Sequence, residues 1–124
     1  MATTKGYVLN LSDTAQTTNA TPTVVATVPV STNQAVTVTV GFTGVKTTYV
    51  DTLGGQVVGT FSRAAGNIAR ASTPLISTIN SLALATAGIS LVANTGTQTV
   101  DITLTGVAAT TIKWSYQITS IYAS

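Results

Sequence analysis

The chain has 124 residues, a formal net charge of +2 and 44% hydrophobic residues, but no cysteine and no histidine. This composition excludes disulfides, zinc or iron sites of the usual His/Cys type, and Ser-His-Asp or Cys-His catalytic units. The length fits one domain, and the scarcity of charge favours association with partners. We therefore expect a non-enzymatic assembly subunit rather than an enzyme.

The first 21 residues are predicted to form a short strand followed by a polar arm. The strand covers residues 5–11, and the polar stretch 12–21 has the composition of an extended arm or loop. This divides the chain into an N-terminal strand and arm, residues 1–21, and a β-sandwich domain, residues 22–124. Two interpretations stay open: the arm contacts a neighbouring subunit through Lys5 and Tyr7, or residues 5–11 form the domain's own edge strand.

Two strands follow in which apolar and polar residues alternate. Residues 23–30 form the first, and Pro29, which lacks an N–H donor, predicts that this strand lies at a sheet edge. Residues 35–42 form the second and have the clearest alternation of the whole chain. The side chains expected to face the core are Val24, Ala26, Val28, Val30, Val36, Val38, Val40 and Phe42.

The middle of the chain is expected to hold short strands separated by Gly-rich turns. In order, these are a strand over 47–53, a hairpin turn at Gly54-Gly55, a strand over 56–63, a turn over 64–67, a short strand over 68–71, and a short helix or irregular strand over 74–81. Arg63 and Arg70 flank a turn and form the only close pair of basic residues. They are predicted to be either a solvated pair or assembly contacts.

Three further strands are predicted near the C-terminus, over residues 89–93, 98–105 and 110–123. The inward side chains expected from alternation are Val100, Ile102, Leu104, Ile112, Trp114, Tyr116 and Ile118. Altogether the sequence predicts an all-β fold: a single antiparallel β-sandwich, jelly-roll-like, with about eight to nine short strands.

Few residues have the chemistry of a ligand site. Asp13, Asp51 and Asp101 have oxygen ligands suited to Ca²⁺, but they lack Asp-x-Asp-x-Asp spacing and are better interpreted as isolated carboxylates. Trp114, the single Trp, is expected to anchor the core, and stacking against a sugar is the alternative. No catalytic residue, metal site or cofactor is predicted.

The charge and hydropathy patterns also bear on partners and location. The five basic residues are scattered, which argues against nucleic-acid binding. No stretch approaches the roughly 20 apolar residues of a membrane span, and the N-terminus does not have the pattern of a signal peptide. We therefore expect the chain to stay in the cytosol where it is made or to join a particle there.

Three segments, taken in order, resemble structural proteins of tailed-phage virions. Residues 98–114 (QTVDITLTGVAATTIKW) are similar to a closing hairpin in which a strand ending in Thr-Gly is followed by small residues and a Thr-Ile-x-Trp strand. Residues 21–28 (TPTVVATV) resemble the opening strand, and residues 59–67 (GTFSRAAGN) resemble a central hairpin. The similarity covers about residues 17–122. It departs over residues 72–87, which are more apolar than the strand and loop expected there.

The resemblance implies a jelly-roll-like β-sandwich within a virion. Its main implication is a capsid decoration (cement) protein on the capsid surface, a homotrimer that bridges neighbouring major capsid subunits. The alternative is a tail or fibre subunit, with receptor (glycan) binding as one role. A secreted carbohydrate-binding module is a third possibility, disfavoured by the absent signal peptide.

Overall fold

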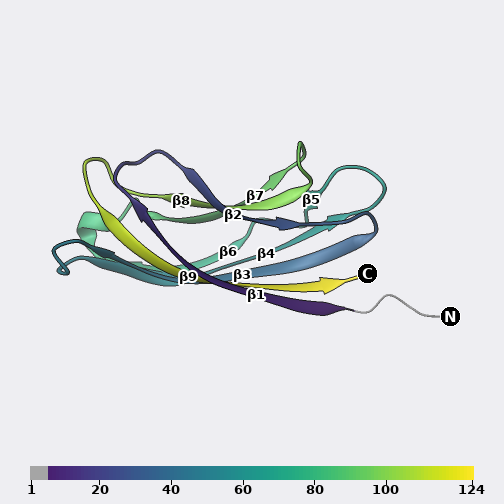
Figure 1. Cartoon of the computed structure of the whole chain (residues 1–124), viewed down its shortest axis with the longest axis horizontal. Coiled ribbons are helices and arrows are strands. Elements are labelled where there is room, and N and C mark those ends of the chain that lie inside the picture. The colour runs from purple at the N-terminus through teal and green to yellow at the C-terminus, as the bar shows by residue number, and fades with distance from the viewer. Residues whose placement is uncertain (1–5) are drawn as a thin grey trace.

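The computed structural model describes residues 6–124, which form two antiparallel sheets packed face to face (Figure 1). The large sheet has six strands in the order β1-β9-β3-β4-β5, with β6 also paired to β4, and the small sheet has the order β2-β8-β7. The elements are β1 (Tyr7–Thr17), β2 (Thr23–Pro29), β3 (Gln34–Lys46), β4 (Thr52–Arg63), β5 (Ala69–Arg70), β6 (Leu75–Asn80), the 3-10 helix η1 (Leu82–Leu84), β7 (Gly88–Asn94), β8 (Thr99–Thr105) and β9 (Ile112–Ala123). The predicted all-β sandwich is confirmed.

The two ends of the chain are nested in the way that jelly rolls are. The first strand, β1, pairs with the last, β9, in the large sheet, and the second strand, β2, pairs with β8 in the small sheet. The nesting stops in the middle of the chain, where β3 and β4 form an ordinary hairpin and β6 returns to β4. The fold is therefore jelly-roll-like at its ends and a meander in its middle.

The core lies between the sheets and is built from alternating residues, as predicted. On β3, Val36, Val38 and Val40 are at most 1% exposed, and the intervening Thr residues face outward. On β9, every second side chain from Ile112 to Tyr122 is buried, and those between them are exposed or, at Thr119, half-buried. Each fully buried Val or Ile contributes about 1.5–3 kcal/mol through removal of apolar surface from water, so this alternation is the main source of stability.

The polar arm expected over residues 12–21 is largely wrong, because β1 continues as a strand to Thr17. Every residue of β1 has a partner on β9, from Tyr7 opposite Tyr122 to Thr17 opposite Ile112. Pairing of this kind uses backbone N–H and C=O groups and does not require apolar side chains. Of the two interpretations of the N-terminal strand, the domain's own edge strand is the one confirmed.

The hairpin predicted at Gly54-Gly55 is also wrong. The turn lies earlier, at residues 47–51, where Tyr49 has a φ of 60°, and Gly54-Gly55 sits inside β4. At Gly55 the φ is +152°, and an added Cβ would lie 2.7 Å from the Cα of Thr78 on β6. This glycine pair therefore lets β6 approach β4 closely. From sequence alone, a Gly-Gly pair in a turn cannot be told apart from one that permits such an approach inside a strand.

Two smaller predictions have mixed outcomes. Pro29 does lie on an edge strand, since β2 is at the edge of the small sheet. Val24, expected to face the core, is half exposed because the register shifts between Val24 and Ala26. The ambiguous segment 74–81 contains a strand, β6, and the helical turn comes just after it.

Candidate assembly surfaces

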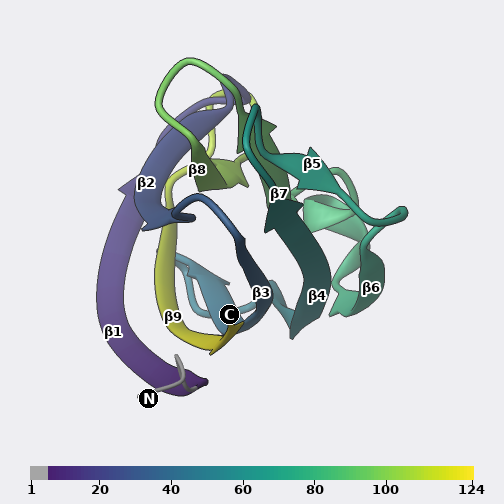
Figure 2. The same ribbon diagram turned by 90° about the vertical axis from the view of Figure 1, so that its right-hand side faces the viewer.

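The first candidate surface is the long edge strand β1, whose side chains from Tyr7 to Thr14 are all exposed. Tyr7, Leu9 and Leu11 share the core-side face of the large sheet, because they lie opposite the buried residues of β9. The small sheet ends at β2 and leaves these three side chains uncovered. Figure 2 shows β1 curving around the outside of the sandwich beyond β2. Apolar side chains on an uncovered edge strand are typical of a surface that pairs with another chain.

β1 is nevertheless held firmly at both ends. Near its start, the ring of Tyr7 stacks on Tyr122 with 4.5 Å between centroids. At its other end, the Trp114 indole Nε1 donates a hydrogen bond of 2.9 Å to the buried Thr17 hydroxyl oxygen. The strand is therefore a fixed part of the sheet, and its exposure is a property of the folded domain.

An apolar groove runs between β1 and β2. It has a volume of about 260 Å³, and its walls include Leu9, Leu11, Val28, Pro29 and Ile118. Tyr122 also lines the groove, and its hydroxyl donates a hydrogen bond of 2.9 Å to the Pro29 carbonyl, which joins the two sheets. Among residues 6–124, no charged side chain lines this groove, so its surface is chemically suited to an uncharged, apolar segment.

The second candidate surface, the β6 patch, is formed by Leu75, Ile76, Ile79 and Leu82 on β6 and η1. Their exposed fractions are 71%, 55%, 86% and 92%. β6 pairs with β4 along one edge, and no described strand pairs with its other edge. Four large apolar side chains beside an unpaired strand edge are too much exposed apolar surface to be explained by scattered surface hydrophobics.

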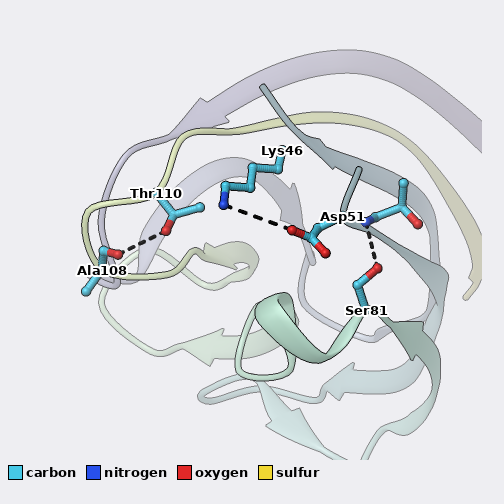
Figure 3. Close-up of polar contacts among 6 residues, drawn as sticks. Lys46, Asp51, Ser81, Ala108 and Thr110 are labelled. Carbon is cyan, nitrogen blue, oxygen red and sulfur yellow. Dashed lines mark hydrogen bonds and ion pairs between the residues drawn. The ribbon is translucent and has the colours of Figure 1, made fainter. Parts of the chain in front are cut away.

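The β6 patch is held in place by polar contacts at one end of the sandwich (Figure 3). The Ser81 hydroxyl accepts a hydrogen bond of 2.9 Å from the Thr52 amide, and the Ser81 amide donates one of 2.8 Å to the Thr52 carbonyl. Nearby, the Lys46 ammonium lies 4.0 Å from the Asp51 carboxylate. These contacts fix the start of η1 against β4, so Leu82 projects from a well-defined backbone.

The sequence did not identify the β6 patch as a site, although a signal was present. Residues 72–87 are the segment in which the chain is more apolar than the proteins it resembles. Apolar residues that find no place in the core remain on the surface, and here they gather on β6 and η1. The excess was visible in the sequence, but its position at a sheet edge was not.

Of the predicted assembly contacts that the structure describes, Arg63 and Arg70 lie at the paired strands β4 and β5, and Tyr7 lies on a different strand. Lys5 lies outside the described residues, and Tyr7 lies on β1. Arg63 closes the loop after β4, with its Nε donating to the Gly66 carbonyl at 2.8 Å, and Arg70 is exposed on β5. Arg63 thus has a structural contact within the chain, and a role for any of the four residues in assembly stays a prediction.

The three carboxylates lie on different elements and have separate local contacts. Asp101, nearly buried on β8, accepts hydrogen bonds from Asn94 Nδ2 at 2.9 Å and Thr99 Oγ1 at 2.7 Å. Asp51 faces Lys46, and Asp13 accepts from the Thr14 amide at 2.8 Å. Within residues 6–124, no three His, Cys, Asp or Glu side chains gather closely enough to hold a metal ion.

Trp114 is a core anchor, as expected, and its alternative role as a sugar platform is wrong. It is 1% exposed and lies 6.0 Å from the ring of Phe42, measured between centroids. Two tyrosines of the same strand are also buried. Burial raises the pKa of Tyr116, with a smaller contribution from the negative charge of Asp13, and burial likewise raises the pKa of Tyr122, with a smaller contribution from Tyr7.

The outer face of the large sheet is a third surface, and it is polar but almost uncharged. Register places Thr14, Ser115 and Thr43 side by side across β1, β9 and β3. Two shallow hollows of about 630 and 590 Å³ lie over these strands. Hydroxyl and amide groups on such a face can form hydrogen bonds with polar ligands that carry no charge.

No family model and no curated protein matches the chain. Among solved structures, it is similar to the tailspike protein of Acinetobacter baumannii phage AM24, with 10% identity, a TM-score of 0.49, and coverage of 94% of this chain and 26% of that one. It is also similar to a tailspike protein of Acinetobacter baumannii bacteriophage Fri1, described as a capsular polysaccharide depolymerase, with 12% identity, a TM-score of 0.46, and coverage of 93% and 18%.

The chain thus spans about a quarter or less of those two tailspikes. Identity and TM-score are both too low to indicate a shared function. Within residues 6–124, no helix has the length and apolar character needed to cross a membrane.

Proposed function

We propose that this chain is a non-enzymatic structural subunit of a phage virion, which acts by adhering to neighbouring subunits. The observation that carries the proposal is the pair of uncovered apolar strands, β1 and β6, at opposite edges of one sheet. Exposed apolar patches and free sheet edges are the usual features of association surfaces. The resemblance of residues 17–122 to tailed-phage structural proteins supplies the virion setting.

The chemistry of the chain supports adhesion rather than catalysis. Each of its three carboxylates has a local structural contact, on β1, at the β3–β4 turn and on β8. A general acid-base pair needs two titratable groups that converge on one substrate position. The stability of the whole particle would come from many modest contacts repeated by symmetry.

Within this class, the position implied by the sequence resemblance is that of a capsid decoration protein. Trimers would sit over the joints between major capsid subunits and resist the outward pressure of packaged DNA. Such a role needs rigid domains with adhesive edges, and β1 is fixed at both ends by the Tyr7 stack and the Thr17 hydrogen bond.

The alternative is a subunit of the tail or fibre that contacts host glycans. The outer face of the large sheet favours it, since its hydroxyl and amide groups suit neutral sugars and Asp13 and Lys113 are the only charged residues that line its two hollows among residues 6–124. Binding of purified protein to a glycan array, lost in a Gln117→Ala variant and kept in a Gln56→Ala variant, would support this alternative. An array without signal would count against it.

Copy number per particle separates the two positions. Quantitative mass spectrometry of purified phage, referenced to the major capsid protein, gives this number directly. Hundreds of copies support capsid decoration, and a handful of copies overturn it in favour of the tail or fibre. Absence of the chain from purified particles overturns the structural-subunit proposal altogether.

A further inference from the structure

We propose that copies of this chain associate head to tail, with β6 of one copy lying along the free edge of β1 of the next. This inference deepens the proposed function, on which it rests for its setting in a virion. It names a second copy of the same chain as the occupant of the groove beside β1.

β1 is an unprotected edge strand. Natural edge strands are commonly blunted by proline, lysine, short length or a bulge. β1 has 11 residues, contains no Pro and no Lys, and keeps an unbroken register with β9. By contrast, β2, at the edge of the small sheet, carries both Pro29 and a register shift. Among the described residues, β1 is therefore the longest unprotected strand edge, since β7, the other edge of the small sheet, has 7 residues.

β6 is the strand of this chain best suited to that edge. Its far edge is free among the described residues, and the segment 75–82 contains no charged residue. A strand added to β1 places alternate side chains beside Leu9 and Leu11 on the core side. There, Ile76, which lies opposite the buried Val57, covers the apolar groove between β1 and β2, while Leu75 and Ile79 lie on the outer face, on the same side as the half-exposed Val8.

The two surfaces are also of adequate size. The four exposed side chains of the β6 patch offer on the order of 500 Å² of apolar surface, against roughly 800 Å² per partner in a standard interface. Backbone pairing and the polar side chains of both strands supply the remainder. In a head-to-tail assembly every subunit uses both edges, so the total buried per subunit is about twice that of one contact.

Topology constrains the symmetry of this contact. β1 and β6 are different surfaces, so the contact is heterologous and produces a ring or an open chain. Four antiparallel steps, β1-β9, β9-β3, β3-β4 and β4-β6, separate the two strands, which therefore run in the same direction. Rotation about an axis parallel to the strands then joins β6 of one copy to β1 of the next as a parallel pair. A closed ring fits the trimer implied by the sequence resemblance.

Complementary variants of the full chain test the contact. Ile79→Lys places a charge on the β6 patch and leaves β1 intact, whereas Leu9→Lys does the reverse. We expect the wild-type chain to be oligomeric and each variant monomeric by sedimentation velocity, with an unchanged thermal unfolding midpoint of the monomer. Val92→Lys, on the half-exposed face of β7, is the matched control and should remain oligomeric.

Mixing the two monomeric variants gives the sharpest result. Ile79→Lys still offers β1, and Leu9→Lys still offers β6, so an equimolar mixture should form a dimer and nothing larger. A symmetric contact of either strand with itself would give no such dimer, and that result overturns the proposal. A wild-type chain that stays monomeric, or an Ile79→Lys variant that stays oligomeric, also overturns it.

Cross-linking locates the contact independently. Because the chain has no cysteine, Ser12→Cys with Ser77→Cys, both on the outer face of the large sheet, gives two unique thiols for a short bismaleimide. We expect intersubunit cross-links for this pair and none for Thr39→Cys with Ser77→Cys, since Thr39 lies in the middle of the large sheet. Cross-linking of the Thr39 pair alone contradicts the proposal. None of these results depends on copy number in the particle, so this inference and the proposed function fail separately.

Discussion

At the scale of single residues, the hydrogen bond between Trp114 and Thr17 fastens the end of β1 to the core. Both residues are buried, so the indole N–H has no access to solvent if its partner is lost. Thr17→Val keeps the shape of the side chain but removes the acceptor. We expect it to lower the free energy of unfolding by about 1–3 kcal/mol, the cost of an unpaired buried donor.

Urea unfolding followed by Trp114 fluorescence measures this loss. Thr119→Val is the control, because it removes an exposed hydrogen bond to Asn10 and should cost much less. Equal losses in the two variants would show that the buried indole pairs with another acceptor and that β1 is not fastened through Thr17.

The buried tyrosines of β9 predict sensitivity to alkaline pH. Burial raises the pKa of Tyr116 and Tyr122 above about 10, the value expected in the unfolded chain. Below pH 10 both states are protonated, so stability is unaffected. Above it the unfolded chain loses protons that the folded chain keeps, and stability falls by up to about 1.4 kcal/mol per pH unit for each tyrosine.

Thermal unfolding midpoints between about pH 8 and pH 11 test this sign. Tyr122→Phe should show a shallower decline above pH 10, together with a loss of about 1 kcal/mol at neutral pH from the missing hydrogen bond to Pro29. A decline that begins below pH 9, or one that Tyr122→Phe leaves unchanged, would rule out tyrosine ionisation as its cause.

At the scale of elements, the placement of β6 depends on Gly55. An Ala Cβ there would collide with the backbone of Ser77 and Thr78, which cannot move without breaking the β4–β6 pairing. The φ of +152° alone makes a side chain costly, by roughly 1–3 kcal/mol. We expect Gly55→Ala to lower stability and to increase amide hydrogen exchange across residues 75–80.

Gly41→Ala is the matched control, because no atom lies within 4 Å of the added Cβ in the neighbouring strand β3. It should leave stability unchanged or raise it slightly, as removal of a strand glycine usually does. If both variants behave alike, the close approach of β6 to β4 is not what requires glycine.

The strands that the sequence predicts well are those with one buried face and one wet face. Alternation located β3 and β9 and the inward direction of their side chains, because burial acts on every second residue. It also located β8, although that central strand is buried on both faces, with Asp101 and Thr103 covered as well. It failed for the second half of β1, which is polar on both faces and is held by backbone pairing to β9. Alternation also predicted the wrong side of the sheet for Val24. A register shift between Val24 and Ala26 changes the direction of the side chain, and the amino-acid pattern contains no sign of it.

The candidate surfaces were less predictable than the fold. The strand containing Tyr7 was identified, but its exposure on both faces depends on where the small sheet ends, which is a tertiary property. The position of the β6 patch depends on the close approach of the β6 backbone to Gly55. In the sequence, Gly55 had instead been interpreted as part of a turn. Edges of sheets are decided by strand order, and strand order is not encoded in local alternation.

At the scale of the whole molecule, the two possible kinds of interface differ in their response to salt. An interface through β1 and the β6 patch has one charged residue, Asp13, on its strands. An interface through Arg63 and Arg70, two of the four contacts predicted from sequence, would depend on attraction to acidic groups. At 0.1 M salt, the attraction between exposed charges is largely screened beyond about 10 Å, and higher salt screens it at shorter distances. The free energy gained by burying apolar surface is not screened in this way.

We therefore expect the dissociation constant of the oligomer to change less than about twofold between about 0.05 M and 0.5 M NaCl. Arg70→Ala, which removes an exposed guanidinium on β5, should leave that constant unchanged. Sedimentation equilibrium at both salt concentrations provides the measurement. Dissociation at high salt, together with weakened association of Arg70→Ala, would place the contact on the arginines instead. The reason is that salt screens the attraction between charged groups, and an interface without charged groups has no such attraction to lose.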